Sequence, residues 1–110
     1  MASSAGMSRL DSLLDLHRKD PTDADLLFMI AHEHFQGGRR AEALPWLQSY
    51  VTKGKDVGAA FRLIAACHLE KGDEGAARAA LREGVEAALR SHHPTMAAEY
   101  RAMLAGMDED

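Results

Sequence analysis

The stretch Leu26–Gly38, LLFMIAHEHFQGG, is apolar on two sides of the helix that its spacing predicts. Leu27, Ile30 and His34 recur every three or four residues and therefore share one face, which also carries Ala31. A second face carries the side chains that remain: Phe28, His32, Phe35 and Gln36. A helix in a soluble protein usually shows water a polar face, so this second face needs another segment or another molecule to cover it.

The same pattern returns 34 residues later in the chain. Aligning the sequence with itself at this offset, without gaps, gives seven identities in one 34-residue window: Ile30/Ile64, Ala31/Ala65, His34/His68, Gly38/Gly72, Ala43/Ala77, Leu47/Leu81 and Val51/Val85. A composition this rich in alanine and leucine gives about two or three by chance. The period therefore indicates two copies of one structural unit.

Small residues hold key positions of this repeat. Ala31 and Ala65 allow a partner helix to approach closely, because a larger side chain would hold the two helix axes apart. Gly38 and Gly72 are expected to adopt the left-handed conformation that ends a helix, which a β-carbon disfavours. This combination is typical of a tight helical hairpin.

Six helices are predicted, because the apolar residues recur at helical spacing and no segment alternates as a β-strand does. The expected ranges are 8–19, 23–37, 40–53, 58–71, 73–91 and 94–107. Residues 1–7 are expected to form a disordered lead and residues 108–110 a solvated acidic tail. The chain is therefore predicted to be all-α, with one domain over residues 8–107.

This period and pattern resemble the tetratricopeptide repeat. The resemblance gives two full repeats, 24–57 and 58–91, preceded by a partial repeat helix over 8–23 and followed by a capping helix over 92–107. It implies antiparallel hairpins stacked as a short right-handed α-solenoid. The tyrosine that the family usually carries one turn before the glycine is replaced by His34 and His68. These two histidines are expected to share a packing role, each with one ring nitrogen hydrogen-bonded.

In such arrays the first helix of each pair lines the concave side. The resemblance therefore implies an apolar groove that binds a peptide or a helix of another protein. The expected groove residues are Phe28, His32, Phe35, Gln36, Arg62, Ala66, Leu69, Glu70, Met96, Tyr100 and Met103. The expected function is that of a non-enzymatic interaction module, either an adaptor or a small chaperone.

Two alternatives remain open for the same surface. Small helical arrays also associate with themselves, so a homodimer or a homo-oligomeric scaffold would use the groove without a foreign partner. The last helix would instead fill the groove if it folded back over Phe28, Phe35 and Leu69.

Metal binding or catalysis through His32, His34, His68 and Cys67 is a third and weaker hypothesis. His32 and His34 are two residues apart and so point about 200° from each other on a helix, whereas two metal ligands on one face are three or four apart. No nucleophile elbow, phosphate-binding glycine loop or paired carboxylates are found. The sequence therefore predicts no enzyme, no cofactor and no metal site.

Composition limits the partners further. The formal net charge of −4 and the lack of a basic stripe argue against nucleic acid. Cys67 is the only cysteine, so it excludes an internal disulfide and fits a reducing compartment. No apolar run is long enough to span a bilayer. A cytoplasmic protein without membrane insertion is expected.

Overall fold

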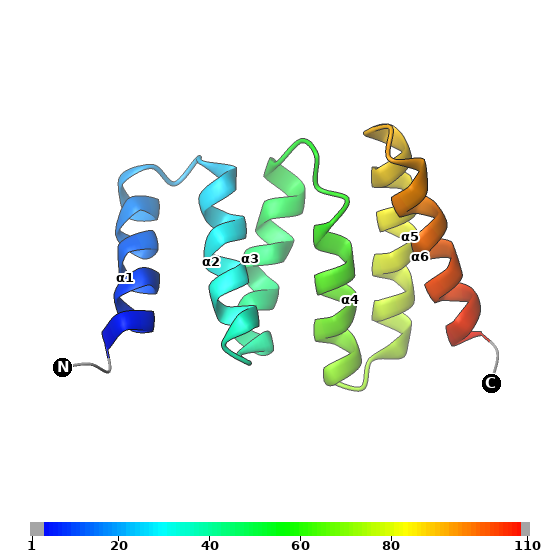
Figure 1. The fold of residues 1–110 in the computed structure, drawn as a ribbon, viewed down its shortest axis with the longest axis horizontal. Helices are drawn as coiled ribbons and strands as arrows, with labels where there is room; N and C mark the ends of the chain where they lie inside the picture. Colours follow the sequence, from blue (N-terminus) through cyan, green and yellow to red (C-terminus); the bar gives the residue numbers. More distant parts are fainter. Residues whose placement is uncertain (1–3, 109–110) are drawn as a thin grey trace. The chain divides into compact units, whose positions relative to one another are not determined.

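The structure is a computed structural model that describes residues 4–108, and their side chains from Arg9 onward (Figure 1). Its helices are α1 (Ser4–Lys19), α2 (Ala24–Gln36), α3 (Arg40–Lys53), α4 (Ala60–Glu70), α5 (Glu74–Arg90) and α6 (Pro94–Met107). The described residues form these six helices and no strand, which confirms the all-α prediction.

The observed helix bounds lie within two residues of the predicted ones, except at the start of the chain. There α1 begins at Ser4, so the expected disordered lead is wrong for residues 4–7. Ala5 and Met7 favour helix, and they extend α1 toward the N-terminus. Residues 1–3 of the expected lead and 109–110 of the expected tail lie outside the described residues.

The helices form two compact units, which divide between Gly54 and Lys55. Unit 1 contains α1, α2 and α3, and unit 2 contains α4, α5 and α6. The boundary lies three residues before the expected boundary between the repeats at 57–58. The single domain expected over residues 8–107 stays a prediction.

In unit 1, α2 packs against both α1 and α3. Most of the expected packing face of α2 is confirmed, because Leu27, Ile30 and Ala31 are buried and so are Ala43 and Leu47 of α3. The remaining two members of this face, His34 and Val51, are half-buried. A second cluster joins α1 to α2, and Trp46 of α3 packs against it. Its members are Leu13, Leu26 and Ile30, with Leu10, Leu14 and Trp46 packed around them.

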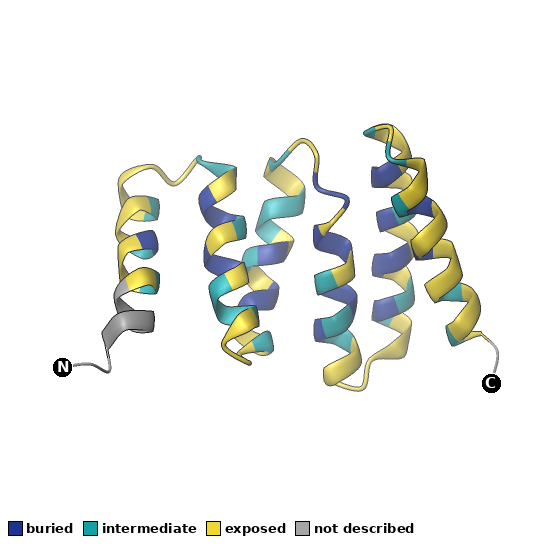
Figure 2. Cartoon of the chain, in the orientation of Figure 1, coloured by how far each residue is buried: buried dark blue, intermediate teal, exposed yellow. Residues whose placement is uncertain are grey.

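In unit 2, α5 lies between α4 and α6 and packs against both (Figure 1). The core is rich in alanine, which permits close contact between the helices. Its buried residues on the three helices are Ala60, Phe61, Ile64, Ala65, Cys67, Ala77, Ala80, Leu81, Gly84, Ala87, Ala88, Ala97 and Tyr100. Figure 2 shows these buried positions along α4 and α5, with exposed residues on the opposite faces.

The turns after α2 and α4 confirm the role expected for their glycines. Gly38 has a φ of 79° and Gly72 a φ of 83°, both in the left-handed region. The turn after α5 repeats this geometry with a residue that carries a β-carbon, His92, whose φ is 62°. The amide of Gly72 donates to the carbonyl of Leu69 at 3.0 Å, and the amide of His92 donates to that of Leu89 at 3.1 Å. His92 therefore occupies a position that favours glycine.

Candidate functional site

Unit 2 carries an open cleft of about 350 Å³ between α4 and α6, with α5 beneath it. Its lining residues are Arg62, Ala65, Ala66, Leu69, Leu81, Met103, Gly106 and Met107. The volume lies at the lower end of the range for ligand pockets, about 300–1,000 Å³.

The cleft has an apolar floor and exposed apolar rims. Ala65 of α4 and Leu81 of α5 form the floor, since each is only 1% exposed. Leu69 of α4 and Met103 of α6 are 45% and 37% exposed, the values of rim residues that water still reaches. Water would leave both rims if an apolar side chain entered, and its release favours binding.

Small residues keep the cleft open. Ala65 and Ala66 of α4 line the cleft, and their small side chains do not fill it. On α6, a β-carbon on Gly106 would meet no other atom within 4 Å. Larger side chains at these three positions would therefore extend into space that is now empty.

Arg62 is the only charged residue in the lining, and its charge already has a partner within unit 2. Its Nη2 lies 3.0 Å from Oε1 of Glu99 on α6, and its guanidinium carbon lies 5.6 Å from the centre of the Tyr100 ring. Both side chains of the ion pair are about half exposed, so the pair contributes only about 0–1 kcal/mol to stability.

The structure places four of the expected groove residues in this cleft: Arg62, Ala66, Leu69 and Met103. Glu70 is exposed beside Leu69 but does not belong to the lining. Met96 is half-buried at the other end of α6, where its sulfur lies 2.9 Å from the place that a β-carbon on Gly58 would take.

Tyr100 was expected to line the groove, and that expectation is wrong because the side chain is fully buried. It shares the inner face of α6 with Ala97, three residues earlier, and that face packs against α5. The ring fits against Gly84, where a β-carbon would lie 2.5 Å from Cε2 of Tyr100. Because Gly84 has no side chain, the Tyr100 ring has room to pack in the core.

The expected groove residues of α2 lie in unit 1, where they contact one another and α3. The ring of Phe28 lies 5.1 Å from that of Tyr50 and 6.1 Å from that of His32, centre to centre. Phe35 lies under the guanidinium of Arg40, whose central carbon is 4.3 Å from the ring centre. Both phenylalanines are half-buried.

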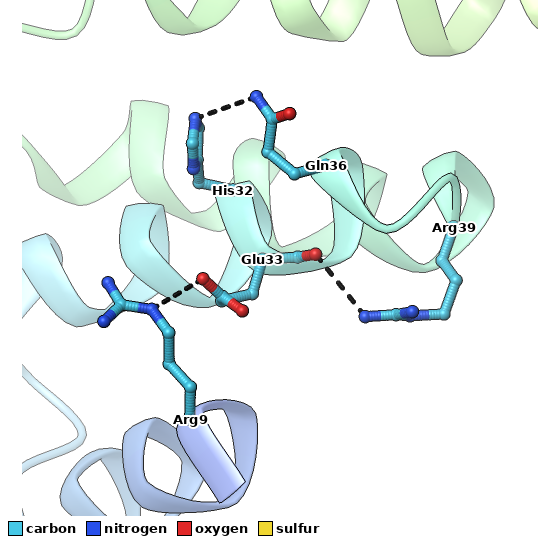
Figure 3. Close-up of polar contacts among 5 residues, drawn as sticks. All are labelled: Arg9, His32, Glu33, Gln36 and Arg39. Carbon is cyan, nitrogen blue, oxygen red and sulfur yellow. Dashed lines mark hydrogen bonds and ion pairs between the residues drawn. The ribbon is translucent and has the colours of Figure 1, made fainter. Parts of the chain in front are cut away.

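Polar groups of α2 are also engaged within unit 1 (Figure 3). Gln36 Nε2 and His32 Nε2 form a hydrogen bond at 3.3 Å, so the two side chains face each other. On α1, Arg9 forms an ion pair with Glu33 of α2 at 2.6 Å. Arg39 donates from Nη2 to the carbonyl of Glu33 at 3.4 Å.

A continuous groove from Phe28 to Met103 stays a prediction, because its residues belong to both units. The alternative in which the last helix covers the groove is wrong for Leu69, which is 45% exposed beside α6. It fails there because α6 turns its inner face to α5 through Ala97 and Tyr100.

Four lining residues were not expected in the groove: Ala65, Leu81, Gly106 and Met107. The repeat pattern assigned Ala65 and Leu81 to helix packing, and they serve the cleft floor as well. Gly106 and Met107 follow Met103 by three and four residues, so helical spacing from Met103 was the signal that would have identified them.

The two repeat-related histidines differ, although an equivalent role was expected. Nδ1 of His34 accepts a hydrogen bond from Nε of Arg39 at 3.1 Å. Burial and, to a lesser extent, the Arg39 charge lower the pKa of His34. Nδ1 of His68 is buried without a hydrogen-bond partner in the described part of the chain. Asp73 takes the place of Arg39 in the second repeat, and its carboxylate accepts the hydrogen bond of the Ala76 amide at 3.0 Å.

Residues that would support other functions are not gathered into a site. Cys67 is buried, at 1% exposure. Among residues 4–108, no three histidine, cysteine or acidic side chains are grouped in a way that would hold a metal ion. In the same part of the chain, no helix combines the length and the apolar character needed to cross a membrane.

No family model, curated protein or solved structure matches this chain. The resemblance to the tetratricopeptide repeat therefore rests on the sequence pattern alone.

Proposed function

We propose that this protein is a non-enzymatic interaction module that binds an apolar side chain of a peptide or helix from another protein in the cleft between α4 and α6. One observation carries the proposal: Leu69 and Met103 remain exposed on opposite rims above a floor formed by Ala65 and Leu81. A peptide anchor placed between the rims would bury apolar surface on both partners at once.

Apolar burial at the cleft supplies part of the binding energy. An apolar anchor of the peptide that becomes fully buried contributes about 1.5–3 kcal/mol. Covering Leu69 and Met103 contributes less for each residue, because each is already more than half buried. Micromolar binding corresponds to about 8 kcal/mol, and association itself costs energy, so flanking contacts of the peptide have to supply the larger part. Met103 and Met107 adapt to anchors of different shape because their side chains are unbranched and flexible.

The sequence resemblance supports the same surface. In tetratricopeptide arrays the first helices of successive repeats line the concave, ligand-binding side. By the repeat pattern α4 is the first helix of the second repeat, and α6 is the capping helix that follows this repeat. Stacking of the two units as a right-handed α-solenoid stays a prediction of this resemblance.

A selection with random peptides tests the proposal. Short peptides displayed on phage would be selected on the full-length protein, and the enriched peptides would be titrated against two variants. Leu69→Glu places a charge on the rim of the cleft. Leu89→Glu is the matched control, because Leu89 is 46% exposed on α5 but does not line the cleft.

We expect enriched peptides to share an apolar anchor and to bind the wild-type protein and Leu89→Glu equally. Binding to Leu69→Glu should be at least tenfold weaker, which corresponds to about 1.4 kcal/mol. If peptide binding weakens equally in both variants, or weakens in neither, the cleft is not the peptide-binding site. Light scattering over a concentration series distinguishes peptide binding from self-association. If the wild-type protein is a dimer and Leu69→Glu is a monomer, the cleft is a self-association surface.

A further inference from the structure

The N-terminus of α4 lacks the cap that the N-termini of α2 and α5 possess. Asp23 accepts a hydrogen bond from the amide of Asp25 at 3.0 Å, and Asp73 accepts one from that of Ala76 at 3.0 Å. The residue before α4 is Ala59, which has no side-chain acceptor. Its backbone is helical, with φ −63° and ψ −26°, whereas N-cap residues normally have an extended backbone. Ala59 therefore provides no side-chain cap for α4.

The first amides of α4 nevertheless find acceptors. Those of Ala60 and Phe61 donate to the carbonyls of Val57 and Gly58, at 3.0 and 3.2 Å. The third amide, that of Arg62, corresponds in position to the amide of Ala76 in α5 and would remain unpaired without a cap.

The hydroxyl of Tyr100 supplies this missing acceptor from α6. It accepts the hydrogen bond of the Arg62 amide at 3.2 Å and donates its own proton to the carbonyl of Gly58 at 2.7 Å. One buried side chain thus forms hydrogen bonds with both the amide of Arg62 and the carbonyl of Gly58. Burial raises the pKa of Tyr100, which keeps the hydroxyl protonated and able to donate.

We propose that Tyr100 is a positioning residue: its hydroxyl is the N-cap of α4 and fixes the separation between α4 and α6 that opens the cleft. Four contacts join α6 to the start of α4: the two hydrogen bonds of Tyr100, the ion pair of Arg62 with Glu99, and the Arg62 guanidinium over the Tyr100 ring. Leu69, two helical turns further along α4, lies on the open rim. α4 is thus held to α6 at its first turn, and the cleft lies beyond that attachment. The effect on binding rests on the function proposed above, but the capping role does not.

Tyr100→Phe tests the capping role because it removes the hydroxyl and keeps the ring against Gly84. Hydrogen exchange measured by NMR would compare the amide of Arg62 with that of Ala76. We expect about tenfold faster exchange at Arg62 and no change at Ala76, since the loss of one capping bond affects only its own amide. Asp73→Ala is the reciprocal control, with faster exchange at Ala76 alone. Equal acceleration at both amides in Tyr100→Phe would reduce Tyr100 to a packing residue and overturn the proposal.

The binding arm uses a peptide selected on the wild-type protein. Tyr100→Phe leaves every lining residue of the cleft in place, so a several-fold rise in Kd would show that the separation between α4 and α6 matters. Faster exchange at Arg62 with an unchanged Kd would refute the positioning role. If no peptide is ever selected, the proposed function fails, whereas the exchange data still decide whether Tyr100 caps α4.

Discussion

Gly84→Ala should destabilise unit 2, although alanine normally stabilises a helix. The new β-carbon would lie 2.5 Å from Cε2 of Tyr100, 2.6 Å from its Cδ2 and 2.9 Å from Cβ of Phe61. These are atoms of two buried side chains, so little room exists for adjustment. Alanine in mid-helix contributes about 1 kcal/mol more than glycine. Overpacking costs about 1–3 kcal/mol, and displacement of the Tyr100 hydroxyl from its partners costs about 1–3 more.

When the gain from alanine is set against the two costs, the free energy of unfolding is expected to fall by about 3 kcal/mol. For a unit of this size it lowers Tm by about 10 °C or more. Gly75→Ala is the control in the same helix, because its β-carbon would meet only Oδ1 of Asp73, at 3.8 Å. That variant should melt at or slightly above the wild-type temperature.

Thermal unfolding followed by circular dichroism measures both variants. Trp46 is the only tryptophan, and it packs against the cluster of Leu13, Leu26 and Ile30 in unit 1. Its fluorescence therefore reports unit 1, while the dichroism reports all helices. If Gly84→Ala melts as high as Gly75→Ala, Tyr100 is not seated against Gly84 and the account of unit 2 is refuted.

Three further predictions concern single residues. The lowered pKa of His34 means that its contribution to stability is complete above its ordinary value of 6.5 and is lost as the pH falls through the folded-state value. The fall in Tm between about pH 7.5 and about pH 5 should therefore be smaller in His34→Gln than in the wild type, and an equal fall would contradict this. His92→Gly should raise Tm by a few degrees, because a β-carbon at a φ of 62° costs about 1 kcal/mol; a lower Tm would show that the turn carries no strain. In an absorbance titration, Tyr100 should ionise above its ordinary pKa of 10.0 and contribute stability that is lost as the pH rises through that higher value; two tyrosines that both titrate near 10.0 would contradict its burial.

The sequence predicted the helices well because their signals are local. Gly38 and Gly72 identified two turns from their conformational preference, and both have the expected positive φ. Ala31 and Ala65 are buried, as the hairpin requires. The roles of these positions depend on helical spacing and on the adjacent turn, and the same pattern occurs in both copies of the 34-residue repeat.

The cleft was harder to predict because it depends on contacts between segments far apart in the chain. Gly84 lies outside the identities of the repeat, and nothing near it in the sequence shows that it accommodates the ring of Tyr100. Met96, Tyr100 and Met103 were assigned to one face from spacing, but the contact with Gly84 turns Tyr100 inward and leaves Met103 on the rim. The phenylalanines of α2 belong to a different unit, so a pattern along the chain did not determine whether they share a surface with Leu69.

Methyl resonances of the methionines give the most direct measurement of binding in the cleft. The chain contains six methionines; Met103 and Met107 line the cleft, whereas Met29 is 39% exposed in unit 1 and serves as the reference. Protein labelled with ¹³C at the methionine methyl groups would be titrated with a peptide from the selection. We predict saturable shifts at Met103 and Met107 and none at Met29. Shifts at Met29 alone, or none at Met103 and Met107 while the peptide binds, would contradict the claim that the cleft between α4 and α6 is the binding site.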